Sequence, residues 1–211
     1  MPRSKLHDAS VYLPPDRSLD SLREAAQECR GCDLFRAATQ AVFGEGPAQS
    51  RVLLIGEQPG SEEDLKGHPF VGPAGRLLDT ALEEAGVPRS EVYITNAVKH
   101  FKFEERGKRR IHKKPNAAEV KACQPWLEAE IEAVEPKIVV CLGATAAQSI
   151  LGRDFRLTQS HGQFFEHPWA KFVTATLHPS AILRAVESED RHRQYRQLVD
   201  DLRVVAEKLK A

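Results

Sequence analysis

The sequence predicts an α/β fold with a mainly parallel, four-stranded sheet. Short apolar runs alternate along the chain with longer stretches whose apolar residues recur at helical spacing. Each run ends at glycine, proline or a polar residue, as strands buried on both faces do. Strands that alternate with helices favour a parallel sheet covered by helices on both sides. We expect one domain over residues 1–211, because a single core can support that length.

Turn residues separate the candidate strands from candidate helices. Ser61, followed by an acid three residues on, is a helix-start pattern. Pro73 is expected at the first position of the next helix and Gly86 at its end. The strands are expected at residues 52–55, 92–95, 137–142 and 172–177.

Other segments are less regular. Residues 1–15 contain prolines and no periodicity, so we expect an irregular arm, followed by a helix that Asp16 caps. Residues 99–115 show neither helical nor strand periodicity and are expected to form a loop, and residues 155–165 a loop or hairpin. Asn116, with a glutamate three residues on, starts a helix that reaches about residue 135.

Composition excludes some classes of protein. Thirty Lys and Arg balance 30 Asp and Glu, so any nucleic-acid site must be a local concentration of positive charge. No apolar run approaches membrane-spanning length, and the first residues lack the apolar centre of a signal peptide. We expect a cytoplasmic protein that has no membrane partner.

Polar side chains follow three of the expected strands. Glu57 and Gln58 come after the first, Asn96 after the second and His178 after the fourth. Carboxyl ends of parallel strands meet at one edge, where ligands bind in open α/β sheets. We therefore expect a site at this edge. Taken alone, the Glu57 turn is also compatible with an ordinary strand-to-helix connection whose polar residues face solvent.

Two further stretches near this edge are unusual. Phe70 lies in a loop rich in proline and glycine, where it either stacks on a ligand or plugs the edge of the core. Residues 99–115 are strongly basic and contain aromatic side chains, a composition suited to gripping a phosphate backbone. The alternative for this stretch is a solvated charge run.

The four cysteines suit a metal site better than disulfides in a reducing compartment. Cys29 and Cys32 form a CxxC pair, whereas Cys123 and Cys141 lie far along the chain. Four thiolates suit a [4Fe–4S] cluster or a tetrahedral zinc, and the presence of only one close pair favours the cluster. The alternative is a redox-free CxxC pair with two core cysteines.

The residues also match a known family. GEQPG with its downstream acids, TNAVKHFK, KRRIH, HPSAILR and the four cysteines closely resemble the UdgX-type branch of family 4 uracil-DNA glycosylases. The resemblance covers about residues 29–186, and KRRIH is its most specific part. One departure is Ser61, where the relatives commonly carry an acid.

The resemblance implies a three-layer α/β/α sandwich with a structural [4Fe–4S] cluster. It implies cleavage of the N-glycosidic bond of uracil in DNA, preferably single-stranded, by a monomer. The implied catalytic residues are His112, Glu57 and His178, with His112 forming a covalent bond to the deoxyribose. The other implied residues are Gln58, Phe70 and Asn96 for uracil, Lys108, Arg109, Arg110, Ser180 and Arg184 for the DNA backbone, and Cys29, Cys32, Cys123 and Cys141 for the cluster.

These side chains suit that chemistry. The Asn96 amide can complement the O4 acceptor and N3–H donor of uracil, and Phe70 can stack on a base taken out of the helix. His178 can donate a hydrogen bond to the developing uracil anion. A neutral His112, oriented by Glu57, can attack the sugar in place of water.

Two other functions compete with this hypothesis. The first is a multiple-turnover family 4 enzyme that uses an activated water, in which His112 only contacts the DNA backbone. The second is a module that binds uracil-containing DNA without chemistry.

Overall fold

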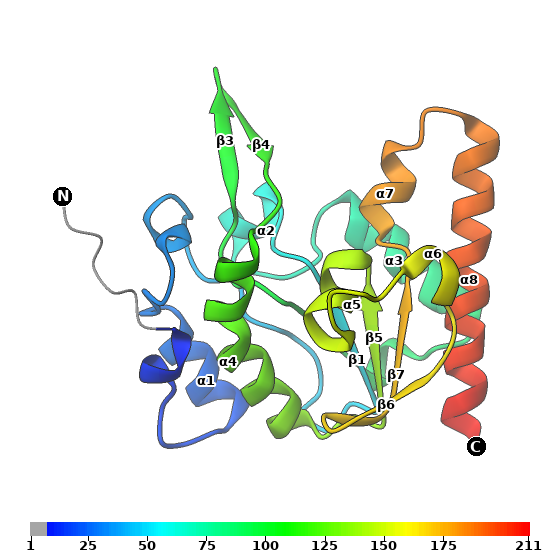
Figure 1. The fold of residues 1–211 in the computed structure, drawn as a ribbon, viewed down its shortest axis with the longest axis horizontal. Coiled ribbons are helices and arrows are strands. Elements are labelled where there is room, and N and C mark those ends of the chain that lie inside the picture. Colours follow the sequence, from blue (N-terminus) through cyan, green and yellow to red (C-terminus); the bar gives the residue numbers. More distant parts are fainter. Residues whose placement is uncertain (1–7) are drawn as a thin grey trace.

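A computed structural model describes residues 8–211 and shows an α/β fold with a mainly parallel central sheet (Figure 1). The strand order is β2-β1-β5-β7-β6, and only β6 runs antiparallel to its neighbour. The sheet strands are β1 (Val52–Gly56), β2 (Val92–Asn96), β5 (Ile138–Leu142), β6 (Phe165–His167) and β7 (Ala170–Thr176). A separate hairpin consists of β3 (Phe103–Arg106) and β4 (Arg109–His112).

Helices cover both faces of the sheet, as the alternating pattern predicts. They are α1 (Leu19–Ala26), α2 (Ser61–Lys66), α3 (Pro73–Ala85), α4 (Ala117–Val134), α5 (Ala144–Leu151), α6 (Leu157–Ser160), α7 (Pro179–Arg184) and α8 (Ser188–Lys210). Short 3₁₀ turns occupy Ala9–Tyr12, Asp33–Arg36 and Arg89–Glu91.

The core has two halves, one on each face of the sheet. Val52 and Leu54 of β1 point into a cluster formed with α3, α7 and α8, while Leu53 and Ile55 point into a cluster with α4 and α5. Successive side chains of a strand face opposite sides, so a run of four apolar residues buries both faces. This explains why β1 is continuously apolar rather than alternating.

Strand order fixes where a ligand can bind. The chain passes from β1 to β2 on one side of β1 and later returns to β5 on its other side. Helices that follow β1 and β5 therefore leave in opposite directions, which opens a crevice at the carboxyl ends of these two strands. This edge is the one to which the sequence assigns Glu57, Asn96 and His178.

Two features of the predicted sheet and loops need correction. The sheet has a fifth strand, β6, which pairs with β7 across a bulge and is too short to be recognised from its composition. The basic stretch is not a loop, because residues 103–112 form the β3–β4 hairpin, which projects from the body of the molecule (Figure 1). Its exposed charged residues conceal the strand alternation, and Gly107, with φ of +60°, makes the turn.

Most helix ends follow the sequence signals. Pro73 begins α3, Gly86 ends it in the left-handed conformation, and Asn116 forms the expected capping box at α4. Two caps differ. Ser18 rather than Asp16 caps α1, with Asp16 accepting a hydrogen bond from the Ser18 hydroxyl.

At α2 the N-cap position is Gly60, and Ser61 is the first helical residue. The hydroxyl of Ser61 is available to another partner, Arg110, described below.

The structure describes only part of the predicted N-terminal arm, residues 8–15. Residues 1–7 of the arm lie outside the described residues, and Ala9 is fully buried against the segment around Gly31 rather than irregular and free. In the described part of the chain, no helix combines the length and the apolar character needed to cross a membrane.

Candidate active site

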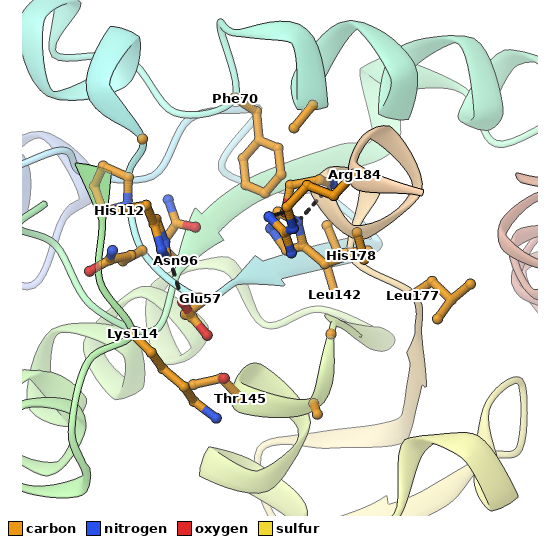
Figure 2. Close-up of a pocket in the computed structure, with 18 of the residues that line it drawn as sticks. Glu57, Phe70, Asn96, His112, Lys114, Leu142, Thr145, Leu177, His178 and Arg184 are labelled. Carbon is orange, nitrogen blue, oxygen red and sulfur yellow. Dashed lines mark hydrogen bonds and ion pairs between the residues drawn. The ribbon is translucent and has the colours of Figure 1, made fainter. Parts of the chain in front are cut away.

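A pocket of about 780 Å³ opens at the carboxyl edge of the sheet, between the β3–β4 hairpin and α7 (Figure 2). Eight residues singled out from the sequence line it, and they come from five separate segments: Glu57, Gln58, Phe70, Asn96, His112, His178, Ser180 and Arg184. The structure thus brings together side chains that are up to 127 positions apart (57 to 184) in the chain.

Asn96 forms the inner wall of the pocket. It is 2% exposed, and its Oδ1 atom is buried with no hydrogen-bond partner among the described residues. Gly56 lies beside it on β1, where an added Cβ would be 2.3 Å from Asn96 Oδ1 and 2.7 Å from Phe70 Cζ. A glycine is therefore required here for the amide and the ring to approach one another. Since buried acceptors are nearly always paired, the free oxygen indicates a ligand with a donor.

Phe70 covers the pocket and adopts an unusual backbone conformation. Its φ is +54°, in the left-handed region that non-glycine residues rarely occupy. The Phe70 carbonyl packs against Gly75, where any Cβ would overlap it at 1.6 Å. Glu63, itself buried, accepts a hydrogen bond from the Gly72 N–H at 2.8 Å and so ties the loop to α2. The aromatic ring is 5.8 Å from the His178 ring, at an interplanar angle of 30°.

His178 follows β7 and presents one nitrogen to the pocket. Its Nδ1 accepts a hydrogen bond from the Ser180 N–H at 3.1 Å, so the proton of the neutral ring sits on Nε2. The pKa of His178 is lowered to about 4, mainly by burial and to a smaller extent by electrostatic interaction with Arg184 and His112. At neutral pH the ring is therefore an uncharged donor. The Ser180 hydroxyl lies 2.8 Å from His178 Nδ1 and also accepts a hydrogen bond from Arg184 at 3.1 Å, so Ser180 links these two side chains.

His112 ends β4 and reaches the same pocket from the hairpin. Its Nε2 lies 3.4 Å from Oε1 of Glu57, the first residue after β1. Burial lowers the pKa of His112, Glu57 raises it, and Arg184 lowers it, with a net decrease. A neutral imidazole keeps a lone pair on one nitrogen while the other faces the carboxylate. This is the arrangement of an oriented nucleophile or base.

Gln58 has a different role from the predicted uracil contact. Its Nε2 donates to the carbonyl oxygens of Lys102 at 3.2 Å and Lys113 at 3.0 Å, and its Oε1 accepts from the Lys102 N–H at 3.1 Å. The amide therefore has no free donor for a base and instead holds together the two ends of the β3–β4 hairpin. The prediction that Gln58 lies at the pocket is right. Its hydrogen-bond partners, however, flank a hairpin that the sequence pattern did not predict.

Arg110 is likewise not available to a phosphate. Its guanidinium pairs with the fully buried Asp64 at 2.5 Å and donates to the Ser61 carbonyl and hydroxyl, each at 2.9 Å. It also lies over the rings of Phe101 and Phe103, at 5.5 and 5.1 Å from their centroids. Arg110 thus fastens the hairpin to α2, and Ser61 serves as an acceptor in that contact.

The remaining predicted DNA contacts of positive charge lie in two places. Lys108 and Arg109 are exposed at the tip of the hairpin, and Arg184 is exposed on α7 across the pocket. Of these three, only Arg184 lines the pocket. Lys114, just after the hairpin, adds one more at the pocket wall.

The comparisons with known proteins decide the family. The model of the uracil DNA glycosylase superfamily matches residues 43–203. The chain belongs to the uracil-DNA glycosylase superfamily.

Relatives of this chain include uracil-DNA glycosylases of two types. A type-4 uracil-DNA glycosylase from Archaeoglobus fulgidus is 39% identical, over 79% of this chain and 83% of the relative. One from Thermotoga maritima is 37% identical, over 81% of this chain and 86% of the relative. A type-5 uracil-DNA glycosylase from Thermus thermophilus is 31% identical, over 66% of this chain and 68% of the relative. The pocket is accordingly the candidate active site of a DNA repair enzyme.

The sequence missed part of the pocket of this glycosylase. Leu142, the last residue of β5, and Gly143 and Thr145, which follow it, line the pocket together with His178. Their apolar and small side chains carry no chemical signal, yet the carboxyl-edge rule that found Asn96 applies equally to the end of β5. Gly143, with φ of +89°, also lets His178 approach, because a Cβ there would be 3.0 Å from the His178 Cβ.

The predicted four-cysteine site does not assemble as expected. Cys29, Cys32 and Cys123 share one buried cluster, whereas Cys141 lies in β5 among the apolar residues of another. Burial raises the pKa of Cys32 to about 11 and those of Cys123 and Cys141 to about 12. Within residues 8–211, no three His, Cys, Asp or Glu side chains are arranged to hold a metal ion. The set of four thiolates therefore does not fit, and Cys141 is its outlier.

The two arginines of the hairpin predict a contrast. Arg110→Met removes a buried charge partner of Asp64 and is expected to loosen residues 103–112, because an uncompensated buried carboxylate is strongly destabilising. Arg109→Met removes an exposed charge and should leave the hairpin intact. Hydrogen exchange of the hairpin amides measures both, and equal loss of protection in the two variants would contradict the role given to Arg110.

Proposed function

We propose that this uracil-DNA glycosylase excises uracil from DNA, preferably single-stranded, and bonds covalently to the sugar through His112, as the UdgX-type resemblance implies. The observation that carries the uracil assignment is the buried, unpaired Oδ1 of Asn96 in the pocket. Uracil N3–H can donate to this oxygen while the Asn96 N–H donates to uracil O4. Cytosine, which presents the reverse pattern, leaves these groups unpaired at a cost of about 1–3 kcal/mol each.

The surrounding residues supply the rest of the binding step. Phe70 offers a ring face for stacking on a base that has left the helix. Loss of stacking in duplex DNA costs a few kcal/mol, so an already unpaired strand is the easier substrate. Arg184 at the pocket, and Lys108 and Arg109 at the exposed tip of the hairpin, are suited to phosphates of the bound strand.

Bond cleavage separates a uracil anion from a cationic sugar. The Nε2–H of neutral His178 donates to uracil O2 as negative charge develops there, a contribution of about 2.7–4 kcal/mol in comparable sites. Neutral His112 attacks C1′ with its lone pair, and the electrons of the N-glycosidic bond leave with uracil. Glu57 stabilises the positive imidazole of the product. Because an imidazole–sugar bond has no release step in this site, we expect a single turnover.

A denaturing gel tests the covalent step. Purified protein, mixed with a labelled single-stranded oligonucleotide that contains uracil, is expected to give a band of summed mass that survives boiling in detergent. His112→Ala should lose this band but still release uracil, because water can replace the imidazole. His192→Ala, an exposed histidine on α8, is the matched control and should keep the band.

Other outcomes of this gel distinguish the competing functions. Abasic DNA in excess of enzyme would make the chain a multiple-turnover enzyme like the type-4 relatives. Recovery of intact DNA, with binding seen only under native conditions, would indicate that the protein binds uracil-containing DNA without cleaving it. Loss of both adduct and base release in His112→Ala would contradict the role assigned to His112.

The pH dependence of the covalent step follows from the protonation of His112. The pKa of His112 is lowered from 6.5, so the rate of adduct formation should be flat above that pH and fall in acid as His112 takes up a proton. Glu57 raises the pKa of His112, so Glu57→Gln should move this acid limb to lower pH, whatever it does to the maximal rate. Single-turnover rates from about pH 5 to 8 measure the limb. A limb that moves to higher pH would contradict the pairing.

For the cofactor, we propose that iron binds at Cys29, Cys32 and Cys123, without Cys141, after these three side chains turn toward the metal from the positions they hold in the metal-free chain. The three share a buried cluster, and binding a metal would convert their protonated thiols to thiolates. Such a cluster would join α1 to α4. Cys123→Ser should therefore lose bound iron and sulfide, measured chemically on the purified protein, while Cys141→Ser should keep both. Loss of iron in both variants would return Cys141 to the ligand set.

A further inference from the structure

A charged pair lies entirely inside the protein, directly behind Asn96. Lys99 is 1% exposed and Glu130, on α4, is fully buried. The ammonium group of Lys99 donates to the backbone carbonyl of Asn96 at 2.7 Å and pairs with a carboxylate oxygen of Glu130. The charged end of Lys99 therefore contacts the backbone of Asn96, the residue that forms the inner wall of the pocket.

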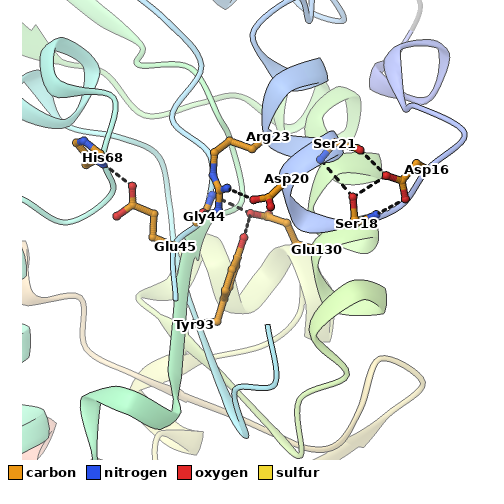
Figure 3. Close-up of polar contacts among 10 residues, drawn as sticks. All are labelled: Asp16, Ser18, Asp20, Ser21, Arg23, Gly44, Glu45, His68, Tyr93 and Glu130. Carbon is orange, nitrogen blue, oxygen red and sulfur yellow. Dashed lines mark hydrogen bonds and ion pairs between the residues drawn. The ribbon is translucent and has the colours of Figure 1, made fainter. Parts of the chain in front are cut away.

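Glu130 connects this pair to two other segments, β2 and the segment around Gly44. Its carboxylate accepts hydrogen bonds from the Gly44 N–H at 2.9 Å, the Tyr93 hydroxyl at 3.0 Å and the Thr95 hydroxyl at 3.0 Å (Figure 3 shows Glu130 with Gly44 and Tyr93). At Gly44, a Cβ would come within 2.4 Å of the carboxylate. Thr95 also accepts from Lys99 at 2.7 Å, which closes the network around the end of β2.

The oxygen of the Asn96 side chain, in contrast, is not held by a hydrogen bond. Among residues 8–211, Oδ1 accepts none, and a Cβ added at Gly56 would lie 2.3 Å from it. The direction of the amide therefore depends on the position of its backbone. That backbone is held at its carbonyl by Lys99, and the next residue, Ala97, donates to the Gly56 carbonyl at 2.9 Å.

Stability alone does not account for such a pair. Removing two charges from water costs more than most buried pairs regain, and apolar residues of similar size are often as stable in their place. A buried ion pair can instead serve to hold the surrounding backbone in one conformation. Here the geometry selected is that of the last residue of β2, where the chain leaves the sheet and enters the pocket wall.

We propose that Lys99 and Glu130 are positioning residues for base selection, which fix the Asn96 backbone so that its amide meets the Watson–Crick edge of uracil. This inference rests on the proposed role of Asn96 in reading uracil. Neither residue touches the substrate. Their effect reaches it through the Asn96 carbonyl, and a displacement of the amide by about 1 Å is enough to slow a reaction by ~100-fold.

The test is a double variant that removes the charges but keeps the volume. Lys99→Met with Glu130→Gln leaves no buried charge and retains an acceptor for Gly44 and Tyr93. A single change at either position would strand a charge and unfold the chain, so the pair is changed together. Arg51→Met with Glu91→Gln, a partly exposed pair at the amino-terminal edge of the sheet, is the matched control.

Single-turnover excision from a uracil-containing single strand gives both a maximal rate and a half-saturating concentration. We expect the double variant to lower the maximal rate about 10- to 100-fold. Half-saturation should be nearly unchanged, because the proposed phosphate contacts are intact. The control pair should match the unmodified protein in both values, and thermal unfolding of all variants verifies that they are folded.

Combination with Asn96→Ala separates positioning from a general loss of structure. If Lys99 and Glu130 act through the Asn96 amide, adding their double variant to Asn96→Ala slows excision no further. If the combined variant is slower than either by the product of the two effects, the inference about Lys99 and Glu130 is wrong. It is also wrong if the double variant has a normal rate while Asn96→Ala is slow. Neither result would contradict the role of Asn96. A wild-type rate in Asn96→Ala would instead overturn the role of Asn96 in uracil binding.

Discussion

The parallel pairing of β1 with a neighbour on each side is the constraint on which the active site depends. Gly56 of β1 is in register with Asn96 of β2, and Ile55 with Cys141 of β5, so these three strands end at the same level. Both faces of the strands are buried, which prevents a slip in register, because a shift by one residue would exchange the two halves of the core. The residues that follow the strands therefore arrive at one place.

The hairpin shows how a flexible-looking segment acquires a fixed position. Its sequence is charged, but the charges divide into two groups with opposite roles. Arg110 turns inward onto Asp64, which is fully buried, while Lys108 and Arg109 remain exposed at the tip. Together with Gln58 at its base, Arg110 makes the hairpin a rigid support for His112. Only the outer group is free to follow a phosphate backbone.

How much the sequence could predict depends on the range of the interaction concerned. Strands β1, β2, β5 and β7 were predicted because each is a local apolar run, and Glu57, Asn96 and His178 because they follow such runs directly. The roles of Gln58 and Arg110 could not be predicted, since their partners lie 44 to 55 and 46 to 49 positions away. Four cysteines in a sequence suggested four ligands, yet β5 carries Cys141 into a different part of the core. A motif names the residue types that meet, whereas their partners depend on the packing of distant segments.

The rigid attachment of the β3–β4 hairpin also bears on whether an imidazole or a water is the attacking group. A water would have to be bound and oriented after DNA enters, whereas the contacts that hold His112 through Gln58, Arg110 and Asp64 are formed within the protein alone. A nucleophile held in place before the substrate arrives has lost most of its freedom already, and this can be worth about 7–11 kcal/mol of a barrier. Burial keeps the His112 ring neutral and Glu57 faces one of its nitrogens, so its orientation and charge state both suit attack on the sugar. These features are of little use to a group that only contacts the DNA backbone, and they are the physical grounds on which we propose the covalent step at His112.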